Sequence, residues 1–363
     1  MTTTGEGPGS TPHEPLSTAT DQPLAGWYPV CRVGDLRAGP FGTTLMDTPI
    51  AVFRDRSGGC HALEDRCPHR NLPLSFGRVT DDGSLECAYH GWRFDGAGRC
   101  LAVPGLTAGE PATGANPVPT HPCTEQDGFV WVWGDRRVEP YGTPVALPDL
   151  GEGGSDQVVF QEDFHCPLID ALENALDVPH TAFLHRGLFR GGSTASITAE
   201  RRALDGGIEV SYRGEPVRFA GLHLPGPART FEHWDRFLLP SVAQVEYRIP
   251  GWLRLVNTML HLPVSADRTR AWYVVRFSSR VPRPVVAGLV RAQGRRILAQ
   301  DANVLERQQA NVRRFAGPRY ASTDLDVMGP AMRALIEAAR HGRRDDGSAP
   351  TTEPPPARVV FDA

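Results

Sequence analysis

The chain contains no lysine: all 38 basic side chains among its 363 residues are arginine, against 42 acidic ones. This absence excludes Schiff-base chemistry on a lysine amine, and the formal net charge of −4 argues against nucleic acid as a partner. No apolar run reaches the roughly eighteen residues that a membrane-spanning helix needs, so we expect none. The seven cysteines show no paired framework, which predicts a reducing, cytoplasmic setting.

Two short motifs carry cysteine and histidine together. Cys67-Pro68-His69 is followed, after seventeen residues, by Cys87-Ala88-Tyr89-His90. Structural zinc accepts two cysteines and two histidines, but it usually takes both cysteines from one loop and both histidines from the other. One cysteine and one histidine from each loop favours a [2Fe–2S] cluster, with the cysteines on one iron and the histidines on the other.

These motifs and their flanks, Pro68, Gly91 and Trp92, resemble those of the Rieske iron–sulfur family. The resemblance implies a Rieske [2Fe–2S] cluster held by two cysteines and two histidines: Cys67, His69, Cys87 and His90. A structural zinc ion stays open as the alternative at this stage.

The pattern of predicted strands and helices changes along the rest of the chain. Short strands and tight turns up to about residue 135 predict a small all-β domain, while later strands precede two helical stretches, 285–315 and 328–341. The predicted class is α+β. The predicted organisation is a disordered leader (1–21), a cluster domain (22–139), a linker rich in proline and glycine (140–156), a catalytic domain (157–343) and a disordered tail (344–363).

A second candidate metal site follows the linker. Asn174, Asp177 and His180 are spaced to share one face of a helix. His185 lies five residues beyond His180, about 140° round an ideal helix, so the two imidazoles would not converge on a straight one. Pro179 should break or distort the helix, which allows both rings to face one point. The alternative is two ordinary histidines near a helix end.

Two histidines need one carboxylate to complete the facial triad of a non-haem Fe(II) oxygenase. Asp301 lies four residues after Ile297 and four before Leu305, so it shares the apolar face of the long helical stretch. A lone buried carboxylate is costly, and a bound metal removes that cost. Asp301 is therefore the predicted third ligand, with Glu306 in reserve, and an Asp bonded to a nearby arginine is the alternative.

Residues 173–185 and 300–306 also resemble the iron-binding segments of the Rieske non-haem iron oxygenases. The resemblance implies mononuclear Fe(II) bound by His180, His185 and Asp301.

The same resemblance gives roles to two neighbouring residues. It implies that Asp177 joins the two metal centres, by hydrogen bonds to His180 of its own subunit and to His90 of the partner subunit, and that Asn174 lies beside the iron.

The resemblance further implies a helix-grip (START-like) catalytic domain and a head-to-tail homotrimer. The chain has no GxGxxG nucleotide fingerprint, so NAD(P)H electrons are expected from a separate ferredoxin or flavin reductase. The length of the chain is similar to that of the vanillate and dicamba demethylase and pheophorbide oxygenase group. That group favours monooxygenation, demethylation or oxidative ring chemistry with O₂.

The expected substrate is an apolar, aromatic or polycyclic small molecule. The use of arginine in place of lysine is typical of a GC-rich genome, and from this we expect a role in secondary metabolism. Candidate lining residues are apolar side chains of the catalytic domain: Phe219, Leu222, Leu224, Phe231 and Trp234. A different class of function stays open at this point, a Rieske electron-transfer protein whose second domain binds a ligand without chemistry.

Overall fold

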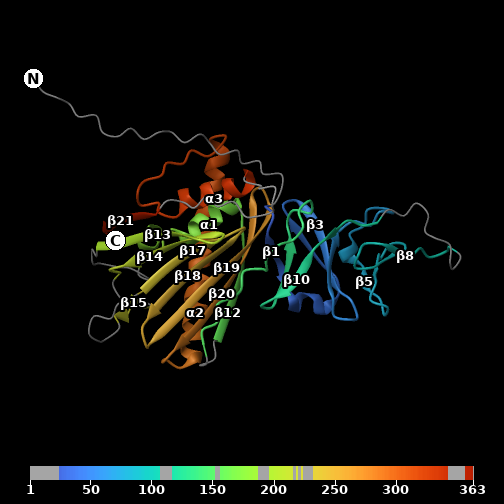
Figure 1. The fold of residues 1–363 in the computed structure, drawn as a ribbon, viewed down its shortest axis with the longest axis horizontal. Coiled ribbons are helices and arrows are strands. Elements are labelled where there is room, and N and C mark those ends of the chain that lie inside the picture. The colour runs from blue at the N-terminus through green and yellow to red at the C-terminus, as the bar shows by residue number, and fades with distance from the viewer. Residues whose placement is uncertain are drawn as a thin grey trace, which may run out of the picture.

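The structure is a computed structural model that describes residues 24–106, 117–151, 156–186, 196–215, 218–219, 222–223, 232–341 and 356–362. Figure 1 shows an all-β N-terminal domain beside a larger domain in which one broad sheet carries helices. No helix in the described ranges is long and apolar enough to cross a membrane.

Three antiparallel sheets build the N-terminal domain, in the orders β1-β11-β10, β2-β3-β4-β9 and β5-β6-β7-β8. The third sheet lies at the end of the molecule remote from the large domain (Figure 1). Trp131 and Trp133 on β11 are fully buried, so both side chains pack in the interior. The elements are β1 (Trp27–Arg32), η1 (Val33–Ala38), β2 (Phe41–Leu45), β3 (Thr48–Arg54), β4 (Cys60–Glu64), η2 (Leu74–Phe76), β5 (Arg78–Val79), β6 (Leu85–Glu86), β7 (Arg93–Phe94), β8 (Cys100–Ala102), β9 (Thr120–His121), β10 (Cys123–Gln126) and β11 (Phe129–Trp133).

The large domain contains one eight-stranded antiparallel sheet, in the order β12-β20-β19-β18-β17-β14-β13-β21. Its strands are β12 (Asp156–Phe164), β13 (Ser196–Leu204), β14 (Gly207–Arg213), β17 (Glu232–Leu238), β18 (Val242–Ile249), β19 (Leu253–Ser265), β20 (Arg268–Ser279) and β21 (Ala357–Asp362). A separate pair is formed by β15 (Arg218–Phe219) and β16 (Leu222–His223). The helices are α1 (Leu168–Leu176), η3 (Pro179–Ala182), α2 (Arg283–Arg314) and α3 (Gly329–His341).

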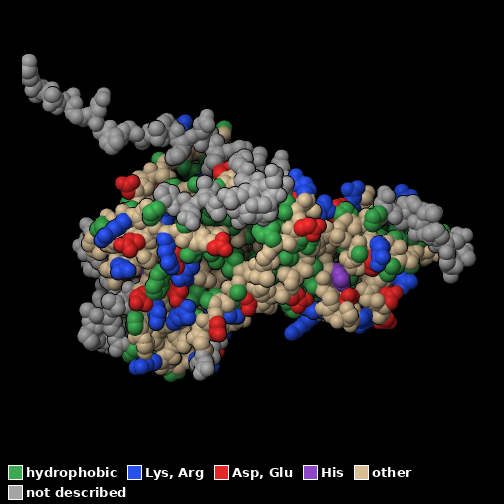
Figure 2. Space-filling model, viewed as in Figure 1, with side chains coloured by type: hydrophobic (Ala, Val, Ile, Leu, Met, Phe, Trp, Pro, Cys, Tyr) green, Lys and Arg blue, Asp and Glu red, His purple; other side chains and the backbone are tan. Residues whose placement is uncertain are grey.

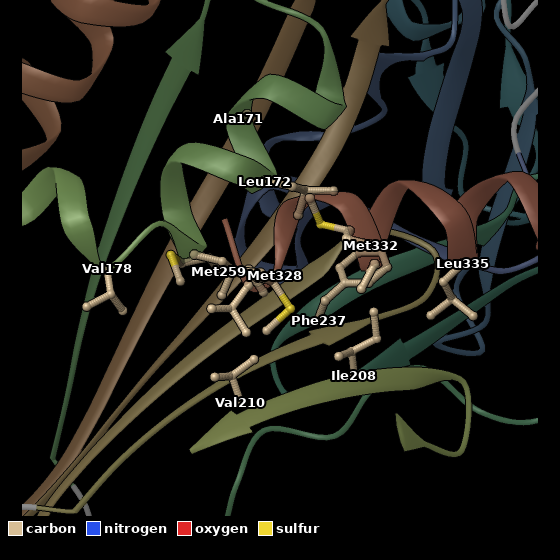
Figure 3. Close-up of a cluster of buried hydrophobic side chains, with 14 of the residues drawn as sticks. Ala171, Leu172, Val178, Ile208, Val210, Phe237, Met259, Met328, Met332 and Leu335 are labelled. Carbon is tan, nitrogen blue, oxygen red and sulfur yellow. The ribbon is translucent and has the colours of Figure 1, made fainter. Parts of the chain in front are cut away.

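The helices bury one face of this sheet. Figure 3 shows Ile208, Val210 and Phe237 pointing from the strands toward Leu172 of α1 and Met332 of α3. Side chains along a strand alternate between its faces, so Ile208 and Val210 both reach this core. The sheet and helices together match the predicted α+β class.

The opposite face of the sheet meets the N-terminal domain and solvent. Trp272 of β20 packs edge-on against Phe129, with ring centroids 5.8 Å apart. The turn between β2 and β3 adds main-chain bonds, because the amides of Met46 and Asp47 donate to the carbonyls of Pro263 and Val264 at 2.8 and 2.9 Å. A shared apolar core therefore joins the two domains.

Away from that junction the outer face is charged, and Figure 2 shows basic and acidic side chains interspersed over the large domain. Arg236 lies at the centre of a ladder across three strands. Its guanidinium donates to Glu209 at 2.6 Å and to Gln244 and Glu246 at 2.9 Å. Arg202 and Arg254 continue the ladder at its two ends.

One prediction about the chain ends was wrong. Residues 344–363 were expected to form a disordered tail, but β21 within it pairs with β13, from Ser196↔Asp362 to Arg201↔Ala357. Phe361 is buried while Val360 is exposed, which is the alternation of an edge strand with one covered face. The predicted leader lies outside the described residues. Residues 140–151 contain neither helix nor strand, and the boundaries of the linker stay a prediction.

Candidate metal centres

The two Cys–His loops of the N-terminal domain have the same backbone design. In each, the amide four residues after the cysteine donates to the cysteine carbonyl, Asn71 to Cys67 at 2.8 Å and Gly91 to Cys87 at 3.0 Å. Both donors have positive φ, 63° for Asn71 and 69° for Gly91, a conformation that Asn and Gly adopt most readily. The two loops thus share one turn, although the histidine follows the cysteine by two residues in the first and by three in the second.

Gly91 is required for a second reason. A Cβ atom there would lie 2.9 Å from Cγ of Pro104. Pro104 therefore packs directly against the second loop.

The four side chains of these loops lie at the tip of the domain. Cys67 and Cys87 are buried, and the rings of His69 and His90 lie 4.4 Å apart between centroids. His69 stacks on Trp92 at 4.8 Å with nearly parallel planes, and its Nδ1 is buried with no hydrogen-bond partner among the described residues. The lone pair of this nitrogen is therefore available to bind iron.

The spacing of the four ligand atoms argues against one zinc ion. Bonds of about 2.0–2.3 Å would hold four tetrahedral ligands within about 4 Å of one another. Within the described ranges, however, the one group that brings three such atoms within 4.8 Å is His180, His185 and Asp301. The Cys–His loops instead leave room for a two-iron cluster.

The second site forms where α1 ends. Asp177 caps α1 with an extended backbone, and Pro179 then starts the 3₁₀ turn η3, so the predicted break occurs. The break turns both rings to one point, with Nε2 of His180 and Nε2 of His185 only 3.2 Å apart.

Asp301 reaches this point from α2, across the domain. Its Oδ1 lies 3.1 Å from Nε2 of His185 and 3.9 Å from Nε2 of His180. The side chain is 8 % exposed, and Oδ1 has no hydrogen-bond partner in the described part of the chain. Glu306, the reserve candidate, is exposed and does not join the group.

Hydrogen bonds on the far side of each ring fix which nitrogen faces the site. Nδ1 of His185 lies 2.9 Å from Oε1 of Gln300, and Nδ1 of His180 bonds the main-chain carbonyl of Asp177. Both acceptors require Nδ1 to carry the proton, so each Nε2 presents a lone pair. Two lone pairs and a carboxylate at such short range repel each other unless a cation lies between them, so the donor set fits a divalent iron.

The proton competes with a metal for this position. Burial lowers the pKa of His185, but its contacts with Asp301 and Gln300 outweigh burial and raise the pKa above its usual value. Metal binding here should therefore weaken as the pH falls.

Gln300 received no role in the sequence analysis, although it begins the segment 300–306 that carries the resemblance. The available signal was that it directly precedes the predicted ligand Asp301, although adjacent helical side chains usually point in different directions.

Asp177 differs in detail from the expectation. The resemblance implied a hydrogen bond from its carboxylate to His180, but the main-chain carbonyl makes that bond, and Oδ2 lies 3.6 Å from Nδ1. The extended backbone at the helix cap turns the carbonyl toward the ring. Asn174 lines the same cavity as His180 and Asp177.

The structure tests one of the five predicted substrate-lining residues. Trp234 lies between His233 and Asp235 on β17 and shares the outer face with Arg236, opposite to Phe237 and the helices, so its assignment to the cavity was wrong. The side chains of the others, Phe219, Leu222, Leu224 and Phe231, lie outside the described residues.

Comparison with known proteins gives a family match for each of the two domains. The profile of the Rieske [2Fe-2S] domain matches residues 26–122, and that of the Vanillate O-demethylase oxygenase C-terminal domain matches residues 164–341. The oxygenase component of dicamba O-demethylase from Stenotrophomonas maltophilia is 31% identical over 336 residues, covering 86% of this chain and 93% of that protein.

Two further relatives differ in how much they share. The 4beta-methylsterol monooxygenase of Methylococcus capsulatus is 42% identical over 241 residues, 63% of this chain and 61% of that protein. The crystal structure of dicamba monooxygenase bound to dicamba has the same fold, with a TM-score of 0.75 at 24% identity over 88% of this chain and 99% of that one.

The cluster domain and the sheet-and-helix domain together define a two-domain iron–sulfur oxidoreductase. The chain belongs to the Rieske non-haem iron oxygenases and is an oxygenase component of that family. The zinc protein and the electron carrier without chemistry are therefore not supported.

Proposed function

We propose that His180, His185 and Asp301 bind one Fe(II) ion and that this ion is where O₂ meets the substrate. The observation that carries the proposal is the convergence of two Nε2 lone pairs and one unbonded carboxylate oxygen, all within 4.8 Å. A two-histidine, one-carboxylate face leaves coordination positions open for O₂ and substrate. Bound there, the iron supplies the redox chemistry, while Gln300 and the Asp177 carbonyl hold the two rings in place.

The second part of the proposal is that Cys67, His69, Cys87 and His90 hold the cluster that feeds this iron. His90 is exposed at the tip of the N-terminal domain, whereas Asp177 lies on the large domain. Figure 1 shows these two regions well separated along one chain. Electrons would therefore pass between protomers, from His90 of one to Asp177 of the next, in a head-to-tail homotrimer.

Exposed apolar side chains near both regions support such an assembly. Phe76 and Tyr89 are largely exposed near the cluster loops, and Phe183 is largely exposed beside His180. Large apolar groups on a surface commonly mark contacts with another protein. In the proposed trimer these two surfaces cover each other, which would place Tyr89 and His90 against η3 and Asp177.

We further propose that the electrons come from NAD(P)H through a separate ferredoxin or flavin reductase. The relative from Stenotrophomonas is named as the oxygenase component of its enzyme, which implies that another component supplies electrons.

The proposed reaction is monooxygenation, with oxidative demethylation as its first candidate form, of an apolar aromatic or polycyclic molecule. Dicamba O-demethylase and a 4beta-methylsterol monooxygenase both oxidise a methyl-bearing compound, and the second shares 42% of aligned residues with this chain.

The experiment that tests the proposal combines the reduced protein, a surrogate ferredoxin and reductase, NADH and ¹⁸O₂ with a panel of methoxybenzoates and 4-methylsterols. We expect substrate-dependent NADH oxidation. One ¹⁸O atom should appear in the hydroxymethyl group formed on a 4-methylsterol, or in the formaldehyde released when a methoxybenzoate is demethylated to its phenol. Cis-diol products with two ¹⁸O atoms would replace monooxygenation by dioxygenation. The absence of substrate-dependent O₂ uptake in protein that carries both metal centres would contradict the proposal for these substrates.

A further inference from the structure

A cavity of about 390 Å³ lies beside the candidate iron site, between α1, α2 and the segment before α3. His180 and Asp177 line one part of it, and Asp170 and Tyr320 line another. The volume is ample for several water molecules, each of which needs a few polar partners. The proposed function uses His180 and Asp177 at one end of this cavity and gives the end lined by Asp170 and Tyr320 no role.

Asp170 is the least accessible acid of this cavity, at 4% exposure. Its Oδ2 accepts hydrogen bonds from Nε2 of Gln309 at 2.5 Å and from the hydroxyl of Tyr320 at 3.1 Å. Asn174 and Asp177 follow Asp170 at helical spacings of four and seven, so α1 presents all three to the cavity. Polar groups thus extend along α1 from Asp170 to the iron site.

The charges around Asp170 do not fully offset its burial. From α3, Nη2 of Arg333 lies 3.9 Å away, but that guanidinium is shared with Glu173, to which its Nε donates at 2.7 Å. Burial raises the pKa of Asp170, and the Tyr320 and Arg333 contacts lower it only in part. The other ionisable groups that face it are the Cys166 thiol and, across the cavity, Asp177 and His180.

We propose that Asp170 is the proton-holding group of a water-filled route that supplies protons from solvent to the iron site. The inference rests on the proposed function, because it assumes that O₂ is reduced at His180, His185 and Asp301. Monooxygenation follows RH + O₂ + 2e⁻ + 2H⁺ → ROH + H₂O, and cis-dihydroxylation also takes two electrons and two protons per O₂. Both forms of the reaction therefore need a proton supply.

Each transfer is balanced. The carboxyl O–H bond of Asp170 breaks as its proton passes to a cavity water, and that water passes a proton on toward Asn174 and His180. The carboxylate then takes a replacement proton from solvent at the other end, where Tyr320 is partly exposed. The electrons come from the cluster and the donor protein. Asp170 touches neither O₂ nor iron, so it acts as a relay residue.

The test uses O₂ itself as the probe. Full-length protein is loaded with both metal centres, reduced anaerobically and mixed with O₂, and re-oxidation of the cluster is followed by its visible absorbance. Rates are measured across a pH range in H₂O and in D₂O, for wild type and Asp170→Asn. Glu337→Gln on α3 is the matched control, because it makes the same carboxylate-to-amide change at a 32%-exposed side chain that does not line the cavity.

We expect re-oxidation of the wild type to slow as the pH rises, because Asp170 loses its proton. Asp170→Asn should be at least about tenfold slower at neutral pH, in line with the usual size of acid catalysis. It should also lose the pH dependence and show a larger solvent isotope effect, while Asp170→Glu regains the pH dependence. Rates are expressed per intact iron site, and Tyr320→Phe, which removes a hydroxyl without changing charge, gives an independent second test.

Equal rates, pH profiles and isotope effects in wild type, Asp170→Asn and Tyr320→Phe would overturn the relay. The His180→Ala/His185→Ala variant separates that failure from a failure of the proposed function. If it re-oxidises as fast as wild type, the iron site takes no part, and the proposed function is refuted together with the relay.

Discussion

Replacing Gln300 with methionine should weaken iron binding without changing the fold. The substitution removes the acceptor that lies 2.9 Å from Nδ1 of the buried His185. In the metal-free protein, the His185 ring can move its proton from Nδ1 to Nε2 and donate it to Asp301, which lies 3.1 Å away, so losing the Gln300 acceptor costs little. In the metal-bound protein Nε2 is occupied, so the proton stays on Nδ1 without a partner. The cost therefore falls on the metal-bound state alone.

The expected magnitude follows from that orphaned donor. A buried donor without a partner costs about 1–3 kcal/mol, which agrees with the 10–100-fold loss of metal affinity typical when such a supporting hydrogen bond is removed. The measurement is an anaerobic Fe(II) titration against a competing chelator. Gln293→Met on the same helix is the control, and Gln300→Glu, which keeps an acceptor, should retain affinity. Equal affinity of Gln300→Met and Gln293→Met would refute the reasoning.

Two further predictions concern stability. The Arg236 side chain is 19% exposed, and Arg236→Met leaves Glu209 and Glu246 with one arginine each, so it should cost about 2 kcal/mol of unfolding free energy. The Arg202 side chain is 69% exposed, so Arg202→Met should cost less than about 1 kcal/mol. Similar losses for the two variants in urea denaturation would contradict this. Burial lowers the pKa of His261 to about 4, below its unfolded value of about 6.5, so the unfolded chain binds the proton first and stability falls as the pH drops from 6.5 toward 4. Between pH 7 and pH 5, His261→Gln should lose about 2 kcal/mol less stability than the wild type, and identical slopes would show that His261 is not buried as a neutral ring.

The sequence predicts a site residue well when residues close to it in the chain set its position. Cys67, His69, Cys87 and His90 lie in two short loops whose turns need Asn71 and Gly91, so motif and geometry are encoded together. The break at Pro179 is equally local, and it turns His180 toward His185 as expected. Asp301 followed from the apolar face of one helix, although its partners lie more than a hundred residues away.

Features that depend on pairing between distant segments were missed. Gln300 gains its role only when His185 is placed beside it, and β21 forms only because β13 offers an edge. The face to which Trp234 points is set by the register of β17 against β14 and β18, which composition does not reveal. The choice between the carbonyl and the carboxylate of Asp177 depends on one backbone angle at the helix cap.

The most direct test of the central claim is the iron and acid-labile sulfide content per chain. Protein purified anaerobically should contain three irons and two sulfides, because a [2Fe–2S] cluster and one mononuclear iron are proposed for each chain. His180→Ala/His185→Ala should contain two of each and keep the visible spectrum of the cluster. Two irons and two sulfides in both proteins, after full reconstitution, would contradict a separate iron site at His180, His185 and Asp301.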